Sequence, residues 1–162
     1  MLKSSFPPVV RPDARLLVLG SLPGERSLAA QRYYAHPQNQ FWSLMTPVVE
    51  RDLVALGYSD RLLALQDAGI ALWDVVASAR RDGSSDAAIR DHRANDLPAL
   101  VARLPLLRAV AFNGAKAAAI GTAALGAKPA VELVTLPSSS PLHTVGIAGK
   151  QPAWDRLRAF LG

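Results

Sequence analysis

The chain has 162 residues, of which 50% are hydrophobic and 19% are charged. This length and composition are typical of one globular domain with a sizeable core and exclude a disordered chain. The sequence has no cysteine, which excludes disulfides, thiolate zinc sites and iron–sulfur clusters, and its three scattered histidines do not favour a metal site. The net charge of +5 favours a polyanionic partner, with nucleic acid first among the candidates.

The sequence predicts no membrane segment. No apolar run approaches the length needed to span a bilayer, and residues 1–8 lack the hydrophobic core of a signal peptide. We therefore expect a cytoplasmic protein without a membrane partner, and we expect a monomer.

Short apolar runs alternate with segments of helical periodicity along the chain. Residues 1–14 predict an extended, proline-bearing N-terminal arm, and Pro47 should kink or restart the first long helix. Ser85 or Asp86 is suited to cap a short helical piece within an otherwise irregular stretch. Strands are predicted over 16–19, 69–76, 107–112 and 131–136, and helices over 39–57, 59–68, 96–104, 115–125 and 151–161.

Strands separated by helices build βαβ units and a parallel sheet. We therefore predict a three-layer α/β/α fold with a short, mainly parallel four-stranded sheet. The sequence contains no internal repeat and no linker that would divide it, so residues 1–162 are expected to form a single domain.

Two predicted strands end abruptly in loops that are suited to binding. The strand over 16–19 runs into the turn Gly20–Gly24, and the strand over 131–136 runs into the serine-rich stretch 137–143. Open α/β sheets bind ligands at the carboxyl ends of their strands. The Gly20–Gly24 turn lacks the lysine of a phosphate loop and the glycine spacing of a dinucleotide fingerprint, so no nucleotide cofactor is expected.

Aromatic and polar side chains are concentrated in residues 33–42, whereas aromatic residues are scarce elsewhere. This mixture suits a pocket for a flat heterocycle, because flat rings stack on aromatic faces and a few polar groups orient them. Tyr34, His36 and Asn39 are the candidates for function in this segment. Phe41 and Trp42 begin an apolar stripe and are better explained as core residues.

With these loops placed, the chain resembles the uracil-DNA glycosylase superfamily, and within it the hypoxanthine-DNA (deoxyinosine) glycosylase branch. The mismatch-specific uracil/thymine glycosylases are the next most similar group. The matching stretches follow the family's order over nearly the whole chain: 20–24 with 27–28, 34–37 with Asn39, Phe41 and Trp42, 70–75, 112–114 and 136–141. The resemblance implies a monofunctional glycosylase that flips a damaged base out of DNA and uses neither metal nor cofactor.

The resemblance also implies which residue handles the attacking water. Relatives with a G-x-D-P or G-x-N-P motif carry the water-activating residue at its third position, where this chain has Leu22, which cannot orient water. The deoxyinosine branch relies instead on the asparagine that matches Asn39. Asn39 would then hold the water through its amide oxygen, and the alternative is a helix N-cap role.

The base pocket implied by the resemblance combines the turn after the first strand with residues from three other segments. Tyr34 would stack on the flipped base, and Asn113 would line the pocket or serve only as a turn residue. Asp74 would accept the N1–H of hypoxanthine or the N3–H of uracil and repel N1 of adenine; the alternatives are a cap or a pair with Arg80 or Arg81. The full expected set is Gly20, Ser21, Leu22, Pro23, Gly24, Tyr34, Asp74 and Asn113.

DNA contacts are expected from the serine-rich loop and its neighbours. Serine side chains and backbone amides donate to phosphates, and Leu142 and His143 lie where the superfamily places the wedge that fills the vacated stack. A plain surface loop is the alternative. The expected DNA-binding residues are His36, Ser138, Ser139, Ser140, Leu142 and His143.

These expectations define a DNA glycosylase that excises a deaminated base, with hypoxanthine first. The alternative within the same class is a uracil or G:U/T mismatch-specific glycosylase, because Asp74 suits both bases. A catalytically silent DNA-binding module remains a different-class alternative, since Leu22 leaves Asn39 alone to carry the water. A small-molecule nucleoside hydrolase fits the pocket but not the basic charge or the serine-rich loop.

Overall fold

A four-stranded parallel sheet lies at the centre of the computed structural model, which describes residues 2–126 and 131–162. The strand order is β3-β2-β6-β7, and every neighbouring pair is parallel. The strands are β2 (Leu16–Gly20), β3 (Ile70–Asp74), β6 (Ala109–Asn113) and β7 (Glu132–Leu136). The predicted fold class and all four predicted strands are therefore confirmed.

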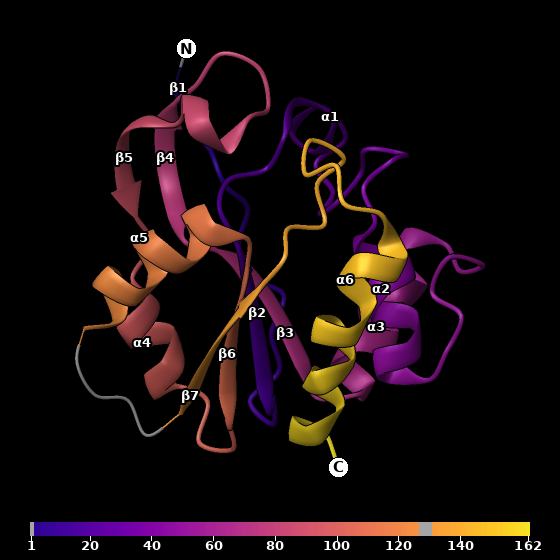
Figure 1. Ribbon diagram of the computed structural model, residues 1–162. Coiled ribbons are helices and arrows are strands. Elements are labelled where there is room, and N and C mark those ends of the chain that lie inside the picture. The colour runs from indigo at the N-terminus through magenta and orange to yellow at the C-terminus, as the bar shows by residue number, and fades with distance from the viewer. Residues whose placement is uncertain (1, 127–130) are drawn as a thin grey trace.

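Helices cover both faces of this sheet and complete three layers (Figure 1). One face carries α2 (Phe41–Val49), α3 (Tyr58–Asp67), and α6 (Ile147–Asp155) with the 3₁₀ helix η2 (Arg156–Phe160). The other face carries α4 (Leu97–Ala102) and α5 (Ala115–Leu125), while the short α1 (Glu25–Ala30) lies near the carboxyl ends of the strands.

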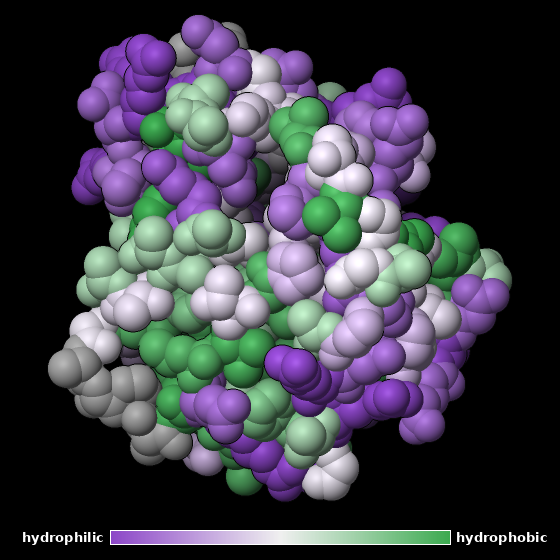
Figure 2. Space-filling model, in the orientation of Figure 1, coloured by the Kyte–Doolittle hydropathy of each residue, from purple (hydrophilic) through white to green (hydrophobic). Residues whose placement is uncertain are grey.

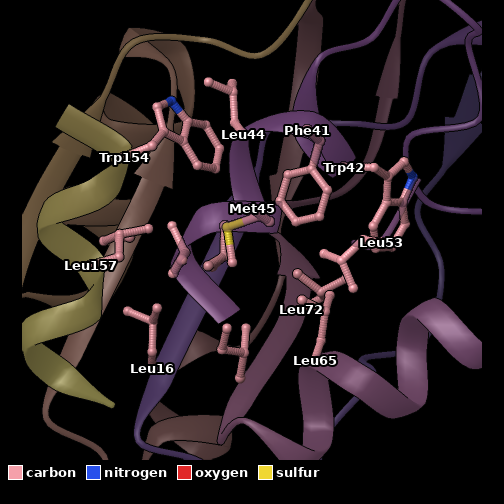
Figure 3. Close-up of a cluster of buried hydrophobic side chains, with 14 of the residues drawn as sticks. Leu16, Phe41, Trp42, Leu44, Met45, Leu53, Leu65, Leu72, Trp154 and Leu157 are labelled. Atoms are coloured by element: carbon pink, nitrogen blue, oxygen red, sulfur yellow. The ribbon is translucent and has the colours of Figure 1, made fainter. Parts of the chain in front are cut away.

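Strand β2 is buried on both faces because its side chains alternate between two cores. Leu16 and Val18 belong to the cluster under α2, α3 and α6, and Leu17 and Leu19 belong to the cluster under α4 and α5. Figure 3 shows the first cluster, in which the labelled side chains of α2 lie between α6 and α3. A strand buried on both faces gives the rigid support from which the loops at its carboxyl end project.

A second, antiparallel sheet of order β1-β4-β5 was not predicted. It consists of β1 (Leu2–Ser4), β4 (Val76–Arg80) and β5 (Arg90–Ala94), and the 3₁₀ helix η1 (Asp86–Ala88) lies between the last two strands. Every residue of β5 is exposed, and hydrophilic side chains cover this part of the surface (Figure 2). Such a strand is held mainly by backbone pairing and has no hydrophobic alternation that a sequence could reveal.

Two predicted helices have different ends in the structure. The first long helix ends at Val49, eight residues before the predicted end at Gly57, because Glu50 adopts a left-handed conformation. Leu53 is still buried, but from the loop that follows the helix. That helix also continues through Pro47 for another two residues, so the proline does not start a new one. The final helix begins at Ile147, four residues before the predicted start, and its last turn is 3₁₀.

The described ranges, 2–126 and 131–162, contain neither a membrane-spanning helix nor a cluster of metal ligands. No helix there is long and apolar enough to cross a bilayer. No group of three or more histidine, aspartate or glutamate side chains there is placed to hold a metal ion.

Candidate active site at the carboxyl ends of the parallel strands

The carboxyl ends of the four parallel strands meet at one edge of the sheet, beside a cavity of about 200 Å³. Gly20 and Asp74 are partners in the register of β2 and β3, and Asn113 and Leu136 are partners in that of β6 and β7. Figure 2 shows the surface hollowed between the β4–β5 sheet and the loop that precedes α6. The cavity is lined mainly by the turn after β2, the segment before α2 and the serine-rich loop after β7.

The structure brings together nearly all of the residues that the sequence placed in the site. The fourteen that line the cavity are Gly20, Ser21, Leu22, Pro23, Gly24, Tyr34, His36, Asn39, Asp74, Asn113, Ser138, Ser139, Ser140 and Leu142. His143 is exposed and does not line the cavity; its backbone N–H donates to the Ser140 carbonyl.

Asp74 is the buried charge of the cavity. Its side chain is 4% exposed, and its Oδ2 has no hydrogen-bond partner among the described residues. Burial, and then the nearby Asp86 carboxylate, raise the pKa of Asp74 to about 7, and Arg81 opposes the rise. No residue forms a salt bridge with Asp74, so the expected alternative of a pair with Arg80 or Arg81 is wrong for the described part of the chain. A buried acceptor without a partner is available to a ligand.

Gly20 is required by the close approach of two polar side chains. A Cβ atom at this position would lie 2.6 Å from Asp74 Oδ1 and 3.2 Å from the Tyr34 hydroxyl. Any larger residue would therefore displace the carboxylate from the position that it holds beside the cavity.

Tyr34 lies at the cavity in a left-handed conformation, with a φ of 55°. One face of its ring is stacked on Phe41, with the ring centroids 3.9 Å apart and the planes 10° from parallel. Its hydroxyl has no hydrogen-bond partner among the described residues, and burial raises its pKa. Only the other face of the ring is left for a base, so Phe41 acts as a support beneath Tyr34.

The amide oxygen of Asn39 is already engaged. Its Oδ1 accepts the backbone N–H of Phe41 at 2.9 Å and the hydroxyl of Ser139 at 2.9 Å. A carbonyl oxygen has two lone pairs, so this atom has none left to accept a proton from water, which differs from our expectation. The bond to Phe41 is a turn that leads into α2, but the N-cap of that helix is Gln40, so the helix N-cap alternative is wrong. The Asn39 Nδ2 group remains available at the cavity.

Asn113 and the serine-rich loop form one hydrogen-bonded unit with Asn39. The Asn113 side chain accepts the backbone N–H of Ser139 at 2.8 Å and donates to its hydroxyl at 2.9 Å. The backbone N–H of Gln40 donates to the Ser139 carbonyl at 2.9 Å. The Asn113 side chain thus fixes the loop through both its Oδ1 and its Nδ2 atom.

Lys150 supports the same unit from α6, which the sequence did not indicate. Its side chain is fully buried, and Nζ donates to Gln40 Oε1 at 2.8 Å and to the Ser140 carbonyl at 3.4 Å. Burial lowers the pKa of Lys150. No apolar pattern marks a buried lysine, which also explains why the predicted start of this helix was late.

Asp86 also lines the cavity, and sequence reasoning placed it only as a possible cap. The cap of η1 is Ser85, whose hydroxyl accepts the backbone N–H of Ala87 at 3.3 Å. Asp86 Oδ1 instead accepts the hydroxyl of Ser21 at 2.5 Å. The only available signal was an acidic residue in an irregular loop, and such a signal does not distinguish a site from a solvated surface.

Comparison with known proteins identifies the family. A sequence model of the uracil DNA glycosylase superfamily matches residues 7–158. The chain is 41% identical over 116 residues to a hypoxanthine DNA glycosylase of Methanosarcina barkeri, covering 72% of this chain and 73% of that protein. It is 35% identical over 157 residues to a hypoxanthine DNA glycosylase of Methanosarcina acetivorans, covering 97% and 98%.

A solved structure gives the same result. The solution NMR structure of a Methanosarcina acetivorans protein assigned as a uracil DNA glycosylase superimposes with a TM-score of 0.87 at 34% identity, covering 99% of both chains. A family match over almost the whole length, relatives above 30% identity and a shared fold agree with one another. This chain belongs to the uracil DNA glycosylase superfamily.

Proposed function

We propose that this protein is a monofunctional DNA glycosylase that removes hypoxanthine from DNA. The observation that carries the proposal is the buried Asp74 carboxylate, whose Oδ2 has no partner among the described residues beside a cavity lined by a tyrosine and polar loops. The relatives named hypoxanthine DNA glycosylase support the same substrate.

Base recognition follows from the hydrogen-bonding edge of each base. Hypoxanthine presents an N1–H donor beside its O6 acceptor, and an ionised Asp74 accepts that donor. Adenine presents a bare N1 acceptor at the same place, which a carboxylate repels. Uracil also presents an imino N–H, so uracil excision is the second candidate, and the same Asp74 geometry favours it.

The remaining residues divide the work of excision. Tyr34 stacks on the flipped base with Phe41 behind it, and the Asn39 Nδ2 group donates to the attacking water and positions it. The serine-rich loop binds DNA phosphates, and Leu142 fills the space that the base leaves. No lysine lines the cavity in the part of the chain that the structure describes, so we assign hydrolysis without a lyase step.

We propose that the enzyme acts as a monomer in the cytoplasm, without metal or cofactor. Size-exclusion chromatography with light scattering and excision in the presence of a chelator test these two points.

A cleavage panel tests the function. Duplex and single-stranded oligonucleotides carry hypoxanthine, uracil, xanthine or a G·T mismatch, and undamaged DNA is the control. We expect excision of hypoxanthine at the highest rate and strand breakage only after alkali. A protein that binds the DNA but excises no base would be the silent DNA-binding module. Strand breakage without alkali would contradict the monofunctional assignment.

Asp74→Asn tests the recognition scheme. The amide still accepts N1–H through its oxygen but loses the charge that repels adenine. Loss of a charge-assisted hydrogen bond costs about 1.5–3 kcal/mol, or about 10- to 150-fold in single-turnover rate. We expect slower hypoxanthine excision and a narrower preference over adenine. If the variant excises hypoxanthine at the parent rate and still ignores adenine, Asp74 does not read the base.

A further inference from the structure

Among the described residues, Asp74 is assigned to the base, and neither Leu22 nor the Asn39 oxygen can take the proton of the attacking water. Leu22, at the position where relatives carry an acid or an amide, is apolar and packs in the core under α4 and α5. The Asn39 oxygen has both lone pairs engaged by Phe41 and Ser139. Asn39 can hold the water by donating from Nδ2, but an N–H donor cannot accept a proton.

Ser21 and Asp86 form a hydrogen-bonded pair at the cavity. Both residues line the cavity, and the Ser21 hydroxyl donates to Asp86 Oδ1 at 2.5 Å. Among the described residues, none donates to the Ser21 oxygen, so its lone pairs remain available. Ser21 is also nearly buried, at 7% exposed, so bulk water competes little for the hydroxyl.

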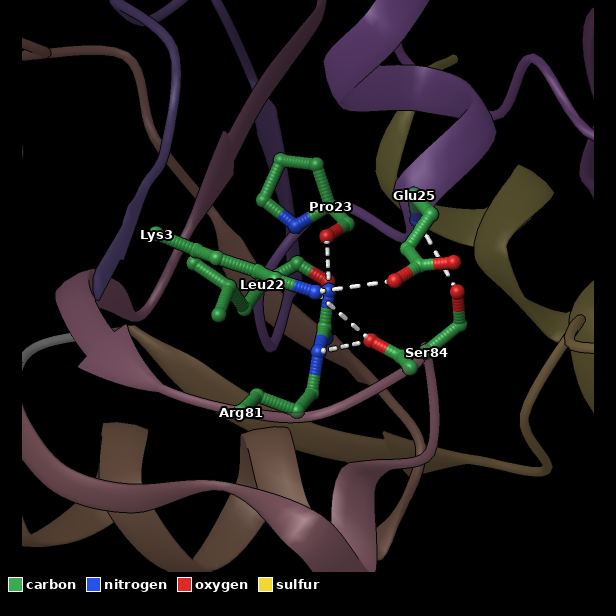
Figure 4. Close-up of polar contacts among 7 residues, drawn as sticks. Lys3, Leu22, Pro23, Glu25, Arg81 and Ser84 are labelled. Carbon is green, nitrogen blue, oxygen red and sulfur yellow. Dashed lines mark hydrogen bonds and ion pairs between the residues drawn. The ribbon is translucent and has the colours of Figure 1, made fainter. Parts of the chain in front are cut away.

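The loop that carries Asp86 is fastened to the turn that carries Ser21. The guanidinium of Arg81, a buried residue, donates to the Leu22 carbonyl at 3.3 Å and to the Pro23 carbonyl (Figure 4). The Ser84 hydroxyl accepts the backbone N–H of Glu25 at 2.9 Å. The contacts of Arg81 and Ser84 therefore hold the loop that carries Asp86 against the turn that carries Ser21.

Asp74 and Asp86 lie in different surroundings at the cavity. Burial raises the pKa of Asp86, and the hydrogen bond from the Ser21 hydroxyl and the charges of Arg81 and Lys116 oppose this rise. Asp74, at the end of β3, has no such hydrogen bond, and the charge of Asp86 raises its pKa further. Paired acids whose surroundings differ in this way are suited to different roles in one reaction.

We propose that Ser21 and Asp86 form the proton acceptor for the attacking water, an assignment that rests on the glycosylase function proposed above. The water gives a proton to Ser21 Oγ as its oxygen bonds to C1′, and Ser21 passes its own proton to Asp86. The bond between C1′ and N9 breaks, and the electron pair leaves with the base, which takes up one proton from solvent, while Asp86 releases the proton that it received to solvent. The products are the free base and an abasic site with a hydroxyl group at C1′.

Ser21 touches the water in this scheme, and Asp86 acts through Ser21. A positioned general base contributes about 10²- to 10⁴-fold to a rate. We expect Ser21→Ala and Asp86→Asn each to lower the single-turnover excision rate by about 10²-fold or more without weakening DNA binding. Asp82→Asn is the matched control, because Asp82 is an exposed acid on the same loop and does not line the cavity.

The pH profile and chemical rescue separate a proton acceptor from a structural tie. The parent rate should rise with pH as both carboxylates ionise. In Asp86→Asn, the part of the rise that comes from Asp86 should be absent. The part that comes from Asp74 should occur at lower pH, because loss of the like charge lowers the pKa of Asp74. Formate should restore part of the rate of Asp86→Ala but none of the rate of Ser21→Ala.

Each outcome decides the question. If the parent excises no base, the proposed function itself fails. If the parent is active and Asp86→Asn stays within threefold of it, the relay is wrong while the function stands. Loss of activity together with DNA affinity, without rescue by formate and with Ser21→Thr equally impaired, assigns the pair a structural role and overturns the relay. Circular dichroism and thermal unfolding of each variant confirm that the protein is folded.

Discussion

Single residues at the cavity are held in states that cost folding free energy. Asp74 is buried with Oδ2 lacking a partner among the described residues, and an unsatisfied buried polar group costs about 1–3 kcal/mol. The Tyr34 hydroxyl is in the same state. Such groups gain their missing hydrogen bonds when a ligand arrives, so their cost to the free protein becomes selectivity for the bound base.

The Asp74 carboxylate predicts an unusual dependence of stability on pH. Its pKa rises from 3.8 to about 7 on folding, so between these values the folded state binds more protons than the unfolded state. The free energy of unfolding therefore falls as pH rises from about 4 to about 7, at up to about 1.4 kcal/mol per pH unit. We expect Asp74→Asn to flatten this fall. Thermal unfolding of both proteins at several pH values measures it, and parallel curves would contradict the assignment.

Substitution of Asn39 should slow base excision. Asn39→Ala removes the Nδ2 donor to water and the oxygen that binds the Phe41 amide and the Ser139 hydroxyl. The single-turnover excision rate should fall by about 10²-fold or more, as for other positioned groups that act in a transition state. Gln38→Ala, at an exposed neighbour, is the control. Unchanged excision by Asn39→Ala would move water positioning to another residue.

At the scale of elements, the loop from β7 to α6 is fixed where it leaves the fold and exposed at its tip. Hydrogen bonds with Asn113, Gln40 and Lys150 fix the loop, and the Trp154 indole donates to the Pro137 carbonyl at 3.0 Å. At the tip, Leu142 is 63% exposed, although it is a large apolar side chain. A rigidly supported apolar side chain beside the cavity fits the insertion of a wedge into DNA.

The wedge makes a prediction about substrates. Leu142→Ala should slow excision from paired DNA more than from single strands, because unstacking costs more in a duplex. Val145→Ala is the control, since Val145 is an exposed apolar residue on the same loop and does not line the cavity. Single-turnover rates on both substrates provide the measurement. An equal effect on both would remove the wedge role.

The sequence was most informative where hydrophobic patterns end. The apolar runs of β2, β3, β6 and β7 are visible because both faces of the sheet are covered, and their ends locate the cavity. The β4–β5 sheet and Asp86 were missed, since β5 is exposed throughout and its pairing depends on backbone atoms. The engagement of Asn39 by Ser139 joins residues 100 positions apart, which no local pattern encodes.

At the scale of the whole molecule, the net charge of +5 predicts how the protein binds DNA. Each phosphate that the protein neutralises contributes about −0.9 to the slope of log K against log salt concentration. We expect affinity for a duplex to fall steeply between about 50 mM and about 200 mM salt. Fluorescence anisotropy over this range gives the slope. Binding that does not respond to salt would contradict phosphate recognition.

The antiparallel sheet is joined to the parallel sheet at one residue. The backbone N–H of Val75 donates to the Gly20 carbonyl, and the Val75 carbonyl accepts the backbone N–H of Asn95. The chain thus departs and returns at Val75, and the contacts of Arg81 and Ser84 with residues 22–25 hold the far end of this excursion against the turn after β2. The excursion carries Asp86 to the cavity. Exchange of the whole excursion, together with the turn that it contacts, would therefore change the acid at the cavity while the parallel strands keep their pairing.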